Sequence, residues 1–259
     1  MAFNERLNLT EFAWTALESR KRPMHVATLL IYAQPADAGK DYLADMVALF
    51  RESTEFVDPF NKRFVAPSLL RPYPTWERDY DLDMEYHVRH LALPAPGGER
   101  ELGALIARLH SNPLDFKRPL WEYHIIEGLE GDRFAVYFKM HHALVDGIAG
   151  VHMLTRSMST DPGDTTAPAL WSAQPPEAVI DVDPSVSRFR RAAKGAVRSM
   201  TSLNNVSQSL LQVFKAARDE KDPFSLPFQS PKSILNGRIS TQRRFATQAY
   251  AFSRIRRLS

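Results

Sequence analysis

Hydrophobic residues in the first part of the chain follow two alternating spacings, which predict strands interleaved with helices. Apolar residues in β-rich runs or at every second position predict strands over residues 24–32, 84–94, 121–128 and 133–140. Apolar residues spaced three to four apart predict helices over residues 11–19, 41–53, 99–111 and 148–158. Thr10 is the expected N-cap of the first helix. Because the two kinds of element alternate, the pattern favours an α/β domain.

The clearest part of this pattern is a hairpin that leads into a corner. One face of the last predicted strand is apolar at every second position, with Phe134, Val136, Phe138 and Met140. The run GLEGD before it, residues 128–132, supplies two glycines for a chain reversal, so a hairpin is expected. Helical spacing begins at Ile148. The run HHALVDG, residues 141–147, therefore lies at a strand-to-helix corner.

The corner sequence resembles the bacterial wax ester synthase/diacylglycerol acyltransferase family, whose motif HHxxxDG it carries unchanged. The family resemblance extends from about Leu9 to the C-terminus and includes residues 23–32, 113–147 and 236–246. HHxxxDG alone is shared with condensation domains of peptide synthetases and related CoA-dependent acyltransferases. The run RPLWE (118–122) in front of it makes the combination more specific.

The resemblance implies a chloramphenicol acetyltransferase-like α/β lobe, with a mixed sheet flanked by helices. It also implies an O-acyltransferase that moves a fatty acyl group from acyl-CoA to a long-chain alcohol or diacylglycerol. Acyl-CoA is then a substrate, and no cofactor is expected. Two alternatives stay open, a condensation-type enzyme that forms amides and a lipid-binding module without catalysis.

The resemblance also assigns roles to residues of the corner. His142, the second histidine of the motif, would be the general base, whereas His141 would point to the opposite face of the strand end and support it. Asp146 would anchor the corner through an arginine, for which Arg118 is the preferred partner in a structural ion pair. Gly147 would allow backbone or substrate to approach the helix start closely.

The residue inventory fits direct attack of an alcohol on a thioester. An imidazole with a pKa of about 6.5 is suited to removing the hydroxyl proton near neutral pH. No side-chain nucleophile is needed, and the chain has no cysteine and no GxSxG motif. A metal site is not expected, because adjacent strand residues face opposite ways and no third strong ligand follows at helical spacing.

Composition changes after the corner and suggests four segments. Residues 1–158 form the N-terminal catalytic lobe, 159–187 a proline-rich linker, 188–240 a helical crossover, and 241–259 the start of a connection to a second lobe. The second-lobe motifs of the family, an ND pair and an SNxPGP-like segment, are absent from the chain. The chain is therefore expected to correspond to an N-terminal half, with the C-terminal lobe as its partner. Asn236 falls in a stretch that the family associates with the active-site region, although a turn at Asn-Gly also explains it.

Residues 188–220 carry an apolar helical stripe with a basic flank of Arg190, Lys194 and Arg198. This segment is either a helix packed on the domain or one that lies on an anionic membrane or lipid-droplet surface. A net charge of +3 is too small to indicate nucleic-acid binding. The charged N-terminus, the absence of cysteine and the lack of an 18-residue apolar run favour a cytoplasmic protein.

Overall fold

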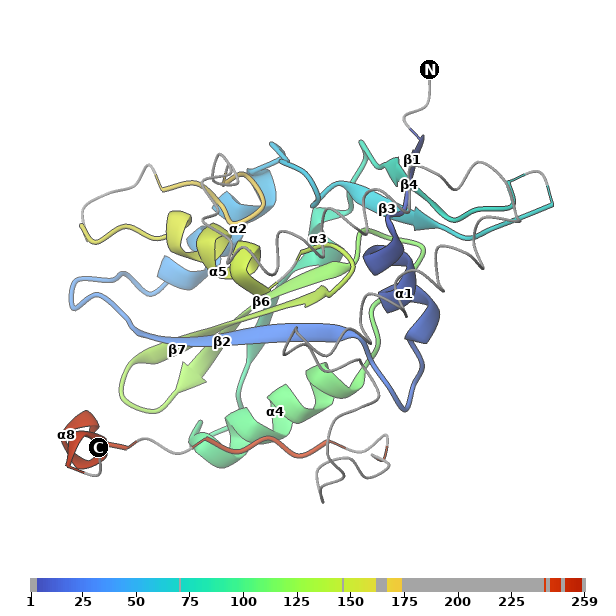
Figure 1. The fold of residues 1–259 in the computed structure, drawn as a ribbon. Coiled ribbons are helices and arrows are strands. Elements are labelled where there is room, and N and C mark those ends of the chain that lie inside the picture. The colour runs from blue at the N-terminus through green and yellow to red at the C-terminus, as the bar shows by residue number, and fades with distance from the viewer. Residues whose placement is uncertain are drawn as a thin grey trace.

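The computed structural model describes residues 4–69, 71–145, 147–161, 167–173, 240, 243–247 and 250–257. Two sheets organise these residues (Figure 1). The larger sheet has the strand order β2-β7-β6-β5, formed by His25–Ala33, Arg133–His141, Trp121–Leu129 and Val88–Ala92. Its pairs are antiparallel except β5 with β6, which is parallel. The predicted α/β class with a mixed sheet is confirmed.

The predicted hairpin joins β6 to β7. Gly128 and Gly131 have φ angles of 82° and 74°, in the left-handed region that glycine adopts at low cost. Gly128 is also packed closely, because a Cβ on it would lie 3.2 Å from the carbonyl oxygen of Leu93. The two glycines that predicted this reversal therefore adopt backbone conformations that favour glycine.

Helices cover both faces of the larger sheet (Figure 1). α4 (Glu99–Ser111) packs Leu102, Leu105 and Ile106 against Ile126, Ala135 and Tyr137 on one face. α2 (Tyr42–Glu52) lies on the other face and buries Leu43 and Val47 against Ile125, Phe134 and Val136. α5 (Gly147–Arg156) covers the same face as α2, near the end of β7. The alternating residues of β6 and β7 thus face two different apolar layers.

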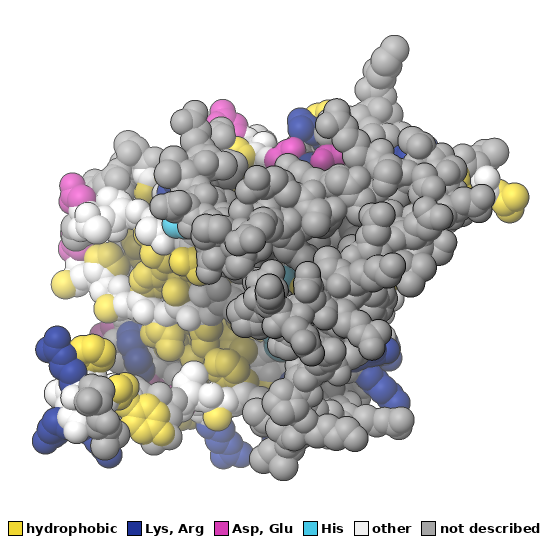
Figure 2. All heavy atoms as spheres, in the orientation of Figure 1, with side chains coloured by type: hydrophobic (Ala, Val, Ile, Leu, Met, Phe, Trp, Pro, Cys, Tyr) yellow, Lys and Arg dark blue, Asp and Glu magenta, His cyan; other side chains and the backbone are white. Residues whose placement is uncertain are grey.

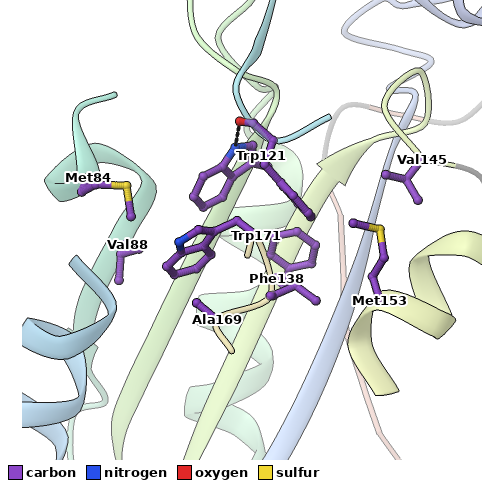
Figure 3. Packing of buried hydrophobic residues seen from close by; sticks show 10 residues of the cluster. Met84, Val88, Trp121, Phe138, Val145, Met153, Ala169 and Trp171 are labelled. Carbon is purple, nitrogen blue, oxygen red and sulfur yellow. Dashed lines mark hydrogen bonds between the residues drawn. The ribbon is translucent and has the colours of Figure 1, made fainter. Parts of the chain in front are cut away.

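The aromatic core shows that part of the predicted linker is structural. Trp171, in residues 167–173, is fully buried and stacks on Trp121 with ring centroids 5.2 Å apart (Figure 3). Its indole nitrogen donates to the carbonyl of Ser53 at 2.8 Å. The described part of the stretch 159–187 is thus not a plain linker, because a large aromatic side chain outweighs the proline-rich composition around it.

Three local predictions need correction. Asn8, not Thr10, caps α1 (Leu9–Leu17), in a reciprocal capping box with Glu11. Residues 84–94 begin with a short helix α3 (Met84–His87), capped by the Asp83 side chain, before the strand β5 starts at Val88. The sequence of residues 243–255 is also β-like, but their described part shows no strand and contains the start of a short helix, α8 (Phe252–Arg256).

The smaller sheet was not predicted. It has the order β1-β4-β3 and consists of Asn4–Arg6, Thr75–Arg78 and Lys62–Val65. Each strand has only three or four residues, which is too short for a recognisable periodicity. No helix in the described segments is long and apolar enough to span a bilayer. The apolar stripe and basic flank of residues 188–220 lie outside the described residues.

Replacing Trp171 tests whether residues 167–173 belong to the core. Trp171→Ala should lower the free energy of unfolding by about 3–5 kcal/mol, because it removes a fully buried ring and leaves a cavity between Trp121 and Tyr123. Urea unfolding followed by fluorescence and circular dichroism measures the change. Leu69→Ala is the control, since Leu69 is fully exposed and should shift stability by less than about 0.5 kcal/mol. Equal effects of both substitutions would place Trp171 outside the core.

Candidate active site

The histidine pair lies at the end of β7, next to the start of β2. His141 is the last residue of β7 and pairs in register with His25. The amide of His141 donates to the carbonyl of Leu120 at 2.9 Å, and the amide of His142 donates to that of Met24 at 2.8 Å. The backbone of both histidines is therefore held by neighbouring segments on two sides.

His141 faces the interior. Its Nδ1 accepts a hydrogen bond from the Ala143 amide at 3.0 Å, so the ring proton resides on Nε2. Nε2 lies 3.7 Å from a carboxylate oxygen of Glu18, beyond hydrogen-bonding distance. Burial, assisted by the nearby His25 and His142, lowers the pKa of His141 to about 4. His141 is thus neutral at pH 7, and its contact with Glu18 is not an ion pair at that pH.

His142 is half-buried and faces away from that interior cluster. Its ring stacks on the indole of Trp14 from α1, with ring centroids 4.7 Å apart and an angle of 15° between the planes. The residue after α1, Glu18, also accepts a hydrogen bond from the Met24 amide. Helix α1 therefore contacts His142 through Trp14, and its C-terminal cap residue, Glu18, lies beside His141.

A cluster of buried charges lies directly behind the pair. Lys139, two residues before His141, is fully buried and forms an ion pair with Glu122 at 3.0 Å across the β6–β7 ladder. Glu122 also lies 3.2 Å from Nε2 of His124 and 3.5 Å from Arg89. Although burial opposes its ionisation, the His124 and Lys139 contacts lower the pKa of Glu122 to about 2. The glutamate of RPLWE is therefore a charged residue of the sheet interior.

A second polar chain links the start of β2 to the end of α4. Nε2 of His25 lies 2.9 Å from the carbonyl of His110, and Nδ1 of His110 lies 2.9 Å from the hydroxyl of Tyr137. Burial is the main cause that lowers the pKa of His25 to about 4. His25 and His110, which are far from the motif in the sequence, thus lie beside the strand end that holds it.

The structure places the other predicted residues as follows. Gly147 starts α5, and a Cβ added to it would meet no atom of the other described segments within 4 Å. No described segment therefore packs directly on this glycine. Arg118 forms an ion pair with Asp83 at 3.1 Å and lies 4.1 Å from the centre of the Tyr86 ring. The residues Asp146 and Asn236 lie outside the described residues.

Sequence reasoning missed Trp14, Glu18 and Met24. They lie more than 110 residues before the motif, and no spacing relates them to it. One indirect signal was present in the sequence: a helix predicted near the N-terminus has an apolar face that must pack on another part of the domain. Within the described ranges no three His, Asp or Glu side chains converge as metal ligands would.

A mixed sheet that ends in an HHxxxDG corner, with a buried first histidine and a more accessible second one, agrees with the lobe that the sequence resemblance implies. Residues 7–259 match the model of the wax ester synthase/diacylglycerol acyltransferase catalytic domain, and the chain belongs to this family. The resemblance seen in the sequence is thereby confirmed.

Individual relatives agree with this assignment. The O-acyltransferase WSD of Acinetobacter baylyi is 37% identical over 98% of this chain and 54% of its own length. A Mycobacterium tuberculosis protein, provisionally named a diacylglycerol O-acyltransferase, is 38% identical over 97% of this chain and 56% of its own length. The solved wax ester synthase/diacylglycerol acyltransferase of Marinobacter aquaeolei VT8 superposes with a TM-score of 0.70 at 34% identity, over 98% of this chain and 54% of that one. The chain thus spans about half the length of the curated relatives it matches.

The low pKa of His141 predicts an acid-sensitive fold. In the unfolded chain a histidine binds a proton near pH 6.5, whereas folded His141 binds one only near pH 4. The unfolded state therefore binds more protons between these values, and stability falls as pH drops from about 6.5 to 4. This residue alone contributes a loss of up to about 3 kcal/mol.

His141→Asn should flatten this pH dependence, because the asparagine oxygen can accept the Ala143 hydrogen bond without titrating. Urea unfolding at several pH values between 7 and 4 measures the slope for both proteins. His152→Asn, on the exposed side of α5, controls for the removal of a histidine as such. An identical slope in the wild-type and His141→Asn proteins would contradict the assignment of a neutral, buried imidazole.

Proposed function

We propose that this chain carries the general base of an O-acyltransferase, which transfers a fatty acyl group from acyl-CoA to a long-chain alcohol or diacylglycerol. The proposal rests on the difference between the environments of the two histidines. His141 is buried, neutral and hydrogen-bonded to the backbone of its own corner, whereas His142 is only half-buried and stacks one face of its ring on Trp14. We therefore assign the contact with the substrate hydroxyl to His142 and not to His141. Names of relatives, which include an O-acyltransferase and a wax ester synthase/diacylglycerol acyltransferase, support the same reaction class.

The reaction follows from general-base catalysis. His142 takes the hydroxyl proton while the alcohol oxygen attacks the thioester carbonyl carbon. The tetrahedral intermediate then collapses, the carbon–sulfur bond breaks, and the proton passes from the imidazole to the leaving thiolate of CoA. The ester and free CoA are the products, and no covalent acyl-enzyme forms.

Trp14 serves as a positioning residue in this scheme. Its indole lies nearly parallel to the His142 ring, so it fixes the ring orientation while leaving the ring edge available. When His142 gains a proton, the face of the indole also attracts the resulting cation.

The proposal includes a second half of the active site. The relatives are about twice as long as the matched segment. We assign the alcohol and acyl tunnel to the interface between this lobe and a C-terminal lobe, which we expect in the remaining half of such proteins. A lipid acceptor would reach such an interface from a membrane or lipid-droplet surface.

Substitution of the histidines tests the base. His142→Ala should reduce turnover about 10²–10⁴-fold, the usual loss when a general base is removed. Release of free thiol from palmitoyl-CoA, with and without hexadecanol or diacylglycerol, is measured with the C-terminal lobe co-expressed. His141→Ala should lose less activity and more stability, because its role is internal. Equally mild losses in both variants would sink the assignment of His142.

Substitution of Trp14 tests the stacking contact. Trp14→Leu should lower kcat/KM about 5–30-fold, as expected from a loss of about 1–2 kcal/mol of cation–aromatic and orienting interaction. Trp14→Phe keeps an aromatic face and should recover most of the activity. Melting temperatures of both variants are measured in parallel. If leucine and phenylalanine were equivalent, Trp14 would only fill space.

A further inference from the structure

An open groove of about 890 Å³ lies between α4 and the segment 243–247, at the opposite side of the larger sheet from α5. Figure 1 shows this segment running alongside α4. Small residues of α4 form the floor: Gly103, Ala104 and Ala107. A volume of this size is in the usual range of small-molecule sites, about 300–1,000 Å³.

The groove is strongly basic. Four arginines and one glutamate line it: Arg100, Arg108, Arg243, Arg244 and Glu99. Within the described part of the chain none of the four arginines has an ion pair, whereas five basic residues of the two sheets each form one: Lys62, Arg63, Arg78, Arg89 and Lys139. In Figure 2, dark-blue Lys and Arg side chains occur at the lower edge of the molecule, where Figure 1 shows α4 and α8. Such a concentration of unpaired guanidinium groups in a concave site favours a ligand with several phosphate charges.

Phe245 adds an aromatic side chain to the same groove. Phe245 is 37% exposed and lines the groove. Its carbonyl oxygen approaches Gly103 so closely that a Cβ there would lie only 2.9 Å away. The absence of a side chain at Gly103 therefore lets the segment lie on α4 and holds Phe245 beside the arginines. An aromatic face next to guanidinium groups is suited to a nucleobase with its phosphates.

One end of the groove lies at the last turn of α4, which contacts β2 through His110 and His25. Ser111 and Arg243 line it at the C-terminal end of α4, where His110 lies. The positive charge of Arg243 acts on both His110 and His25, and His25 pairs in register with His141. A ligand held in the groove thus lies on the same side of the sheet as His141, next to the strand ends that carry the motif.

We infer that this groove binds the phosphorylated nucleotide of the acyl-CoA substrate, with the arginines contacting phosphate groups and Phe245 stacking on the adenine. The inference rests on the proposed acyltransferase function and adds the place where the CoA nucleotide is recognised. An anionic lipid headgroup is the competing ligand with the same phosphate chemistry. The concave shape and the exposed aromatic ring favour the nucleotide.

Calorimetric titration of the full chain with CoA, and separately with adenosine 3′,5′-bisphosphate, tests the inference without requiring turnover. Arg243→Gln combined with Arg244→Gln should raise the Kd of both ligands at least tenfold. Arg254→Gln with Arg257→Gln removes the same charge from the region of α8, outside the groove, and should change Kd less than twofold. Phe245→Leu should weaken the binding of adenosine 3′,5′-bisphosphate but leave the binding of inorganic pyrophosphate unchanged.

Gly103→Val separates a built groove from mere surface charge. It retains every arginine but displaces the segment from α4, so it should weaken nucleotide binding about as much as the arginine variant, with the fold checked by circular dichroism. Equal losses in the groove and control arginine pairs would overturn the inference, as would groove variants that lose only flotation with phosphatidylglycerol vesicles. If the nucleotide binds in the groove but no thiol is released, the proposed acyltransferase function is rejected and the groove assignment stands. If the protein turns over substrate and the groove variants leave Kd unchanged, the groove assignment is rejected and the proposed function stands.

Discussion

The ion pair between Lys139 and Glu122 fixes the part of the sheet on which the candidate site depends. Lys139 uses all three of its donors, to Glu122 at 3.0 Å and to the carbonyls of Leu109 and Asn112 at 3.1 Å each. A slip of β7 by one residue would turn this ammonium group into the aromatic layer and leave two buried charges unpaired, at a cost of about 3–5 kcal/mol. The same slip would exchange the faces of His141 and His142. The pair therefore makes the wrong register costly and protects the orientation of both histidines.

Once the register is set, the two histidines are held by different means. His141 is enclosed by the sheet and by Glu18, and this burial keeps its ring neutral. Its Nδ1 accepts the hydrogen bond from the Ala143 amide in the turn. His142 has a main-chain bond to Met24 and one aromatic neighbour, Trp14. A general base needs a fixed direction and an accessible nitrogen together, and stacking on one face provides the first without removing the second.

The sequence revealed what local periodicity encodes. The hairpin, α4 and the strand-to-helix corner could all be predicted, because each has an apolar spacing or a glycine whose conformation is required. The Trp14 and Glu18 contacts could not, since they depend on how α1 docks after folding. The burial of Trp171 was not predicted, because this residue lies in a proline-rich stretch whose composition indicates a linker. The role of Glu122 was also hidden, because only the strand register shows that it meets Lys139.

α4 connects the separate features of the lobe. Its apolar face packs on the sheet, and its last turn accepts hydrogen bonds from Lys139 and His25 through the carbonyls of Leu109 and His110. Its outer face carries Gly103 and two of the four groove arginines. A shift of this helix along its axis would therefore disturb the buried ammonium group and the groove at once. Loss of a hydrogen-bond partner would leave the buried ammonium group of Lys139 unsatisfied, so its contacts fix the position of α4 on the sheet. The groove residues on α4 are therefore also held in place.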